Sequence, residues 1–413
     1  MRVRERVGSG AVVALVAFFG VALAAYLDGQ LSMALFQYTP VPHGWRDHAL
    51  LDGFARYDSA WYLHIALKGY FYDGPNVQSA VAFFPAYPAA IRALHYVVRD
   101  AVLAGVLVTL ACGAVFAVLF RRWCAAAFGD RASWYALALL LVYPFSYYLF
   151  GAVYSDALFV LSVIVSFLLV EYDRPVLAGL VGMVATAGRP VGLALVAGLV
   201  LRDLEIRGVL GPARPALFSP RPADPGGGRL TLLPRRLDLR ALRWCDAGVL
   251  LSLLGLAGYA LYLWWRFHDP LAFERGSTAP GWDRHVNLRT IAHVVYFQLL
   301  RSYGLNQITF WLTVQGVLSV LALASVPWLV RHLGWGYGVY VLLAVGVAFV
   351  SAPQFIGMGR YVLPAFPTFA LAGRWLSERA VGRRRWLPVA ALAASAALLA
   401  WMTSLYARWV FLA

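Results

Sequence analysis

The sequence is poor in charged residues. Charged side chains make up 13% of the 413 residues and hydrophobic ones 61%, and the mean hydropathy is +0.68. A soluble domain is about half apolar and about a quarter charged, so this composition excludes an ordinary soluble domain. We predict a multi-span membrane protein that forms a single integral membrane domain over residues 1–413.

Cysteine and lysine are also scarce. The three cysteines, Cys112, Cys124 and Cys245, lie far apart and form no CxxC or Cys/His ligand pattern, which excludes a disulfide framework and a structural zinc site. The histidines form no HxxxH or HExxH arrangement, so no metal or cofactor is predicted. Lys68 is the only lysine, and the dominance of Ala, Gly, Arg and Val indicates a GC-rich bacterial genome.

The formal charge of +15 comes from arginines that cluster in short loops beside apolar runs. Membrane topology and anionic lipid headgroups select this placement, so we predict membrane lipids and no nucleic acid as partners. A transmembrane helix needs about 20 apolar residues. Stretches of this kind predict an all-α polytopic fold of about eleven transmembrane helices, near residues 10–27, 80–98, 101–120, 133–150, 152–170, 175–201, 246–266, 309–330, 335–352, 361–376 and 387–406.

Orientation follows from the two strongest basic loops. Residues 202–244 carry nine arginines against four acids, with many prolines and a Gly-Gly-Gly run, and read as a disordered basic cytoplasmic loop. Residues 377–386 are the second such loop. Counting spans from these loops places the N-terminus inside, and residues 28–79 and 267–308 become the first and second extracytoplasmic loops.

The same count leaves one conflict. Three further arginines, at positions 121, 122 and 131, fall outside, and this would be reversed if residues 80–98 were re-entrant. The count also places Asp156 and Arg189 on the cytoplasmic side.

The first outer loop is unusually acidic and carries Asp58 within an aromatic stretch. Asp58, Trp61, Tyr62 and Ile65 recur at helical spacing, so residues 54–66 are predicted to form an interfacial helix with the carboxylate at its start. There Asp58 could act as a base on a lipid-borne substrate. The alternative is a solvated loop anchored by Trp and Tyr.

The residues around Asp58 also carry a resemblance. The residues concerned are Arg56-Tyr57-Asp58-Ser59, Trp61-Tyr62-Leu63, Ile65-Ala66, Gly69-Tyr70, Ala82-Phe83-Phe84-Pro85 and Tyr87-Pro88. This pattern resembles the opening signature of the PIG-V mannosyltransferases, which add the second mannose of GPI anchors, and of their bacterial relatives. Weaker matches follow at residues 153–159, 187–192 and 359–367. Tyr57 stands where the family has Trp, and Trp61, where eukaryotic members carry His, fits the bacterial branch.

The resemblance implies a GT-C type glycosyltransferase. Such enzymes take a sugar from a polyprenyl phosphate on the outer face of the membrane, and an acidic residue in the first outer loop is usually essential. Asp58 matches that residue and is the predicted catalytic base. Predicted substrate-binding residues are Tyr57, Trp61, Tyr62, Tyr70 and Asp156.

Displacing a lipid phosphate also requires cations, and arginine binds two oxygens at once. The predicted phosphate-binding arginines are Arg56, Arg189 and Arg360. Arg56 would also keep the neighbouring Asp58 ionised. Arg360 lies at the outer end of a span, in a Gly357-Met358-Gly359 setting where small residues would let a headgroup approach, and its alternative role is interfacial anchoring.

Arg189 lies inside an apolar run, where a charge is costly and therefore indicates function. Its alternative is pairing with a carboxylate or with the carbonyls of a broken helix. Asp156 follows Ser155 at the start of a span, where its alternative is to cap a helix N-terminus.

We therefore predict a plasma-membrane, multi-pass, inverting mannosyltransferase with an extracytoplasmic active site. Its partners would be a polyprenyl phosphomannose donor and a glycolipid or lipid-anchored glycan acceptor. The rivals are transfer of another sugar, such as arabinose or glucose, and a lipid or solute transporter. Transporters often have repeated halves with paired broken helices, whereas here the polar residues concentrate in one outer loop.

Overall fold

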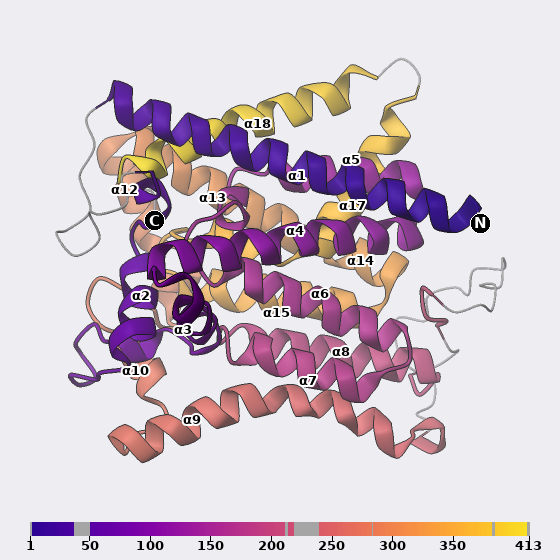
Figure 1. The fold of residues 1–413 in the computed structure, drawn as a ribbon, viewed down its shortest axis with the longest axis horizontal. Coiled ribbons are helices and arrows are strands. Elements are labelled where there is room, and N and C mark those ends of the chain that lie inside the picture. The colour runs from indigo at the N-terminus through magenta and orange to yellow at the C-terminus, as the bar shows by residue number, and fades with distance from the viewer. Residues whose placement is uncertain are drawn as a thin grey trace.

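The computed structural model describes residues 2–36, 50–210, 214–218, 239–282, 284–381 and 385–410. All secondary structure in these residues is helical (Figure 1). The α-helices before the basic loop are α1 (Arg2–Leu35), α2 (Ser59–Lys68), α3 (Ala86–Val98), α4 (Ala101–Phe128), α5 (Asp130–Leu141), α6 (Asp156–Glu171), α7 (Pro175–Thr186) and α8 (Gly192–Arg207). Those after it are α9 (Leu254–Phe267), α10 (Ala272–Ser277), α11 (Leu288–Ile291), α12 (Val294–Tyr303), α13 (Gln307–Ala324), α14 (Val326–Leu333), α15 (Trp335–Ser351), α16 (Met358–Val362), α17 (Phe366–Arg379) and α18 (Trp386–Ala407). The 3₁₀ helices are η1 (Asp52–Phe54), η2 (Ala80–Ala82), η3 (Ser146–Leu149), η4 (Leu239–Ala241) and η5 (Trp244–Leu253).

The predicted all-α polytopic membrane fold is confirmed. Five helical stretches of the described residues are long and apolar enough to cross a membrane: Ser9–Leu35, Ala101–Phe128, Trp244–Phe267, Gln307–Leu333 and Trp386–Ala407. By this criterion the count of eleven is not confirmed, since several of the remaining helices are shorter. Large apolar side chains face outward along α1 and α9, such as Val16, 67% exposed, and Trp265, 73% exposed. Lipid tails solvate such a surface and water does not.

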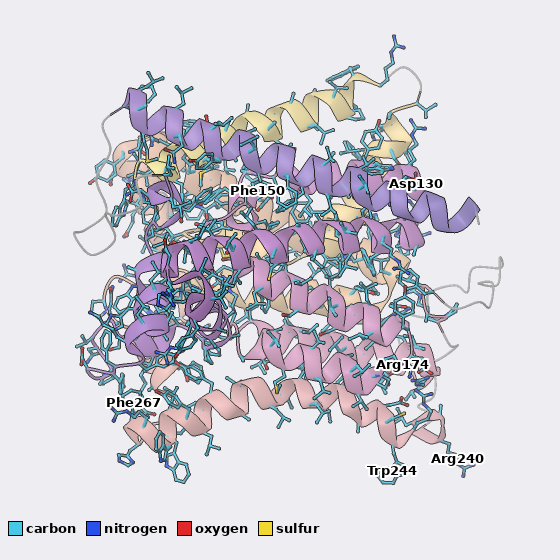
Figure 2. All side chains as sticks on the ribbon, viewed as in Figure 1. Asp130, Phe150, Arg174, Arg240, Trp244 and Phe267 are labelled. Carbon is cyan, nitrogen blue, oxygen red and sulfur yellow. The ribbon has the colours of Figure 1, made fainter. Side chains whose placement is uncertain are left out.

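The long helices run between two ends of a bundle (Figure 1). We call them the N-terminal end, where the chain begins, and the C-terminal end, where α2, α3, α10 and α12 gather. Asp130, Arg174 and Trp244 are labelled at the N-terminal end and Phe267 at the C-terminal end (Figure 2). Between them lies a core of fully buried aromatic side chains that include Phe116, Trp123 and Phe167.

Residues 80–98 do not form the predicted span. The stretch consists of η2 and the 13-residue helix α3, which lies at the C-terminal end of the bundle (Figure 1). Pro85 precedes α3 and, lacking an N–H, interrupts a continuous helix. The backbone N–H of Ala86 donates a hydrogen bond to the carbonyl of Ala187, 2.9 Å away, which fixes α3 beside the turn between α7 and α8.

Residues 175–201 are not one span either, because α7 and α8 are separate helices joined by a reversal at residues 187–191. Pro190 cannot continue α7. The helices approach so closely that a side chain on Gly192 would lie 2.7 Å from the Cα of Thr186. Only glycine fits this turn.

The two miscounted stretches leave the predicted side of the N-terminus unchanged, but they reverse the predicted side of every residue between them. Asp156, at the start of α6, makes its ion pairs at the C-terminal end, together with Arg189 and Asp58. Asp173, just after α6, pairs with Arg207 and Arg243 at the other end. The placement of Asp156 and Arg189 on the side opposite Asp58 is therefore wrong. Residues 121–131 likewise lie at the N-terminal end, which removes the conflict over their arginines (Figure 2).

The predicted loop boundaries also change. Helix α1 continues to Leu35, seven residues beyond position 28, and residues 37–49 lie outside the described part of the chain. Helix α8 continues to Arg207, and residues 214–218 pack against the bundle, since the Leu217 N–H donates to Glu171, 2.7 Å away. Residues 219–238, where most of the predicted disorder falls, are outside the described residues. The 267–308 segment contains α10, α11 and α12.

Candidate active site

Asp58 lies at the N-terminus of α2 with its carboxylate turned away from the helix. Its side chain makes no capping bond to the helix amides, and its Oδ2 lies 3.0 Å from Nη1 of Arg360. The Asp58 backbone N–H donates to the Tyr154 hydroxyl, 3.0 Å away. The side chain is 33% exposed. Among the described residues, no donor contacts its Oδ1, so this oxygen faces the site with its lone pairs available.

Arg360, in α16, bridges two carboxylates from different helices. One nitrogen contacts Asp58, and Nη2 lies 3.2 Å from Oδ2 of Asp156. The guanidinium lies over the rings of Tyr148 and Tyr154, with centroids 4.9 Å and 4.4 Å away. A planar fork can hold two acceptors and stack on aromatic rings at the same time, which a lysine cannot.

Asp156 completes a charge cluster with Arg189. Its other oxygen, Oδ1, accepts a hydrogen bond from Arg189 Nη1. We call Asp58, Asp156, Arg189 and Arg360 the Asp–Arg quartet. Its formal charge is zero, and a buried charge persists only when paired in this way. Asp156 is fully buried, whereas Asp58 is the most exposed member of the quartet.

The contacts of the quartet decide between the alternative roles that the sequence left open for Arg189 and Asp156. Arg189 pairs with a carboxylate, which was one of its alternatives. Asp156 does not cap α6, because its carboxylate is held by two arginines and the N-cap residue is Ser155. Gly359 has a structural role, since a side chain there would lie 2.4 Å from the ring of Phe145. Gly359 thus admits a core aromatic ring, and the idea that it leaves space for a headgroup is wrong.

Arg56 and Tyr57 lie on another side of the α2 segment. Arg56 is fully buried, donates to Asp52 at 2.9 Å and lies over the ring of Trp409. The cation paired with Asp58 is thus Arg360 rather than Arg56. The Tyr57 hydroxyl donates to the Val410 carbonyl at 2.5 Å. Both residues fasten the segment before α2 to the residues that follow α18.

Electrostatic effects in this segment follow from burial. Burial raises the pKa of the Asp52 carboxyl, and its ion pair with Arg56 offsets part of the increase. Burial also raises the pKa of the Tyr57 hydroxyl, which stays protonated. Burial lowers the pKa of His64, and the charge of Lys68 adds to this effect. Tyr57 therefore acts as a hydrogen-bond donor and not as an acid or base.

An aromatic cluster begins one helical turn after Asp58. Trp61 stacks on Phe83 at 5.6 Å between centroids, and Trp282 meets both rings edge-on at 5.6 Å. Trp61, Phe83 and Trp282 are each partly exposed. Trp282 comes from the 267–308 segment, so two segments that are far apart in the chain build this surface together.

Hydrogen bonds hold the side chains of Tyr62, which is buried, and Tyr70, which is half-buried. Tyr62 is buried, and its hydroxyl bonds to that of Ser155 at 2.9 Å, next to Asp156 in the chain. The Tyr70 hydroxyl donates to the Phe83 carbonyl at 2.8 Å. The two tyrosines shape the site by fixing α6 and the aromatic cluster.

Several residues of the site were missed by sequence reasoning. Tyr148 and Tyr154 underlie Arg360, and Arg284 donates to the hydroxyl of Tyr361. Tyr154 and Tyr361 fall inside the weaker motif matches, which was the available signal. Nothing in the sequence around Arg284 distinguishes it from the other arginines of its loop. In the described part of the chain, no group of three or more His, Cys, Asp or Glu residues could hold a metal ion.

No known family and no curated protein matches the chain. Solved structures of the oligosaccharyltransferase from Archaeoglobus fulgidus are similar to this chain over most of the length of this chain. The form tethered to an acceptor peptide is 13% identical, with a TM-score of 0.46, over 96% of this chain and 55% of the other. The form of AglB with an inhibitory peptide and a dolichol-phosphate is 13% identical, with a TM-score of 0.45, over 95% and 55%. This chain thus spans about half the length of those proteins, and similarity this low assigns no function.

Proposed function

We propose that the protein is a GT-C type, PIG-V-like glycosyltransferase. It transfers a sugar, mannose by the motif resemblance, from a polyprenyl phosphate to a glycolipid or lipid-anchored glycan. The observation that supports this most directly is the Asp–Arg quartet. It gathers the acidic residue of the opening motif and residues of all the weaker motif matches at one end of a membrane bundle.

In the proposed reaction, Asp58 is the base. The acceptor hydroxyl forms a bond to the anomeric carbon, the bond from that carbon to the phosphate oxygen breaks, and the electron pair leaves on the phosphate. The hydroxyl proton passes to Asp58, whose Oδ1 is open to receive it. Attack opposite the leaving group inverts the anomeric configuration.

The quartet also balances the charge that develops. With Asp58 ionised its formal charge is zero, and with Asp58 protonated it is +1. At that moment the donor phosphate changes from a diester with one negative charge to a monoester that carries more. Arg360 loses one of its two carboxylate partners as the leaving group forms, so its stabilisation of the phosphate increases in the transition state, where it accelerates the reaction. Arg189 adds a second, deeper positive charge.

The aromatic cluster is a surface suited to a sugar. Trp61, stacked on Phe83 and met by Trp282, presents an apolar ring one helical turn from Asp58. We assign Trp61 to direct substrate contact. Tyr62, Tyr70 and Tyr57 hold that surface and α2 in place, and Asp156 orients the two arginines.

The charge distribution supports an extracytoplasmic site. Arginines lie near the end of α4 and the start of α5, at the end of α8 and at the end of α17, and these helix ends lie at the N-terminal end of the bundle, opposite α2 (Figure 1). Arginine-rich loops stay in the cytoplasm. The quartet would then face outward from the plasma membrane, where a polyprenyl phosphate headgroup can reach it.

Replacing Asp58 with Asn tests the proposal. Asn keeps the volume but accepts no proton, so transfer from radiolabelled polyprenyl phosphomannose to membrane lipids should fall by about 10²- to 10⁴-fold, mainly in kcat. Donor binding should persist. Asp73→Asn is the matched control, because Asp73 is exposed in the same outer segment. Near-normal transfer by Asp58→Asn, or an equal loss in the control, would refute the assignment. Asp52 is a poor control, since its loss leaves buried Arg56 without its ion pair.

A further inference from the structure

We propose that Arg284, from the segment between α10 and α11, binds the phosphate of the lipid donor. This inference rests on the proposed function and extends it to a residue outside every motif match. It makes the 267–308 segment part of the active site.

The position of Arg284 is fixed by contacts to the quartet's own neighbourhood. Its Nη1 donates to the hydroxyl of Tyr361, the residue after Arg360, and its guanidinium lies 5.2 Å from the centre of that ring. Arg189 lies 5.1 Å from the centre of the same ring. Tyr361 is thus shared by a quartet arginine and by Arg284.

The surroundings of Arg284 are open enough to admit a headgroup. A side chain on Gly357 would lie 3.6 Å from its Nη2, and glycine leaves that space unfilled. Both Arg284 and Tyr361 are partly exposed. Gly357, and not Gly359, is therefore the glycine that allows an approach from outside.

Trp282 shows how the segment joins the rest of the site. Trp282 lies two residues before Arg284, and its ring contacts the rings of Trp61 and Phe83. A sugar on the aromatic cluster and a phosphate at Arg284 would both touch this one segment. In a sugar phosphate a single oxygen joins the sugar to the phosphorus atom. This short link fits a sugar site at Trp282 and a phosphate site at Arg284, two residues apart in the chain.

The charge of Arg284 separates it from the other arginines. Arg189 and Arg360 are neutralised by Asp156 and Asp58. Among the described residues, no carboxylate lies within ion-pair distance of Arg284, and its hydrogen-bonded side-chain partner is the hydroxyl of Tyr361. The ground-state donor carries one negative charge, and Arg284 is a cation that can pair with it before the reaction. Arg360 contributes later, when Asp58 takes the proton.

The test measures binding without turnover. Purified protein is titrated with a radiolabelled polyprenyl phosphate, with the uncharged polyprenol as a parallel probe. Charged hydrogen bonds predict that Arg284→Gln weakens polyprenyl phosphate binding by about 10- to 100-fold and leaves polyprenol binding unchanged. Arg284→Lys should bind with intermediate affinity, because it keeps the charge and loses the fork.

Arg275→Gln is the matched control. It removes the same charge from the same segment, at a side chain 57% exposed and paired with Asp269 at 2.8 Å. Unchanged polyprenyl phosphate affinity in Arg284→Gln, or an equal loss in Arg275→Gln, would overturn the inference even if wild-type protein transfers sugar. A specific loss in Arg284→Gln, together with a wild type that transfers no sugar, would uphold the phosphate site and reject the proposed reaction.

Discussion

The buried pair of Asp156 and Arg189 offers a quantitative test of the quartet. Asp156 is fully buried and contacts Arg189 through one oxygen and Arg360 through the other. Asp156→Asn changes the formal charge of the quartet from zero to +1, and Arg189→Gln changes it to −1. Each single variant therefore leaves a charge unpaired inside the bundle, at a cost of about 3–5 kcal/mol.

The double variant Asp156→Asn/Arg189→Gln restores a formal charge of zero, because Arg360 still pairs with Asp58. We expect its free energy of unfolding to lie closer to wild type than that of either single variant. Unfolding of the detergent-solubilised protein in increasing SDS, followed by circular dichroism, measures all four members of the cycle. Additive losses in the double variant would show that the two residues are not energetically coupled and would refute the quartet as a neutral unit.

Two further predictions concern packing and topology. Gly359→Ala places a methyl group 2.4 Å from the Phe145 ring, which should cost about 1–3 kcal/mol of stability and displace Arg360. Gly258→Ala is the control and should be neutral, because no atom lies within 4 Å of the added methyl group. Thermal unfolding and transfer assays compare the two variants, and equal behaviour would contradict the prediction. The exposed native Cys245 should resist an impermeant maleimide in intact cells, and a cysteine in place of Asp73 should react; the reverse pattern would invert the proposed orientation.

The sequence alone determined the features that depend on composition and local spacing. Long apolar runs require helices in a bilayer, because no water is present there to bind free backbone groups. The motif around Asp58 identified the exposed carboxylate of the quartet, and the arginine-rich loops set the orientation that we propose. Helix α2 was expected within residues 54–66 and forms at Ser59–Lys68.

The tertiary structure decided how the parts meet. Hydropathy counted one span at 80–98, where two prolines and a short helix lie at the bundle end, and one at 175–201, where Pro190 and Gly192 turn the chain back. Each miscount moved Asp156 and Arg189 to the wrong side. Their pairing with Arg360, and the approach of Arg284 to Tyr361, join residues far apart in the chain. Such contacts depend on how the helices pack, and the local spacing of residues in the sequence does not predict them.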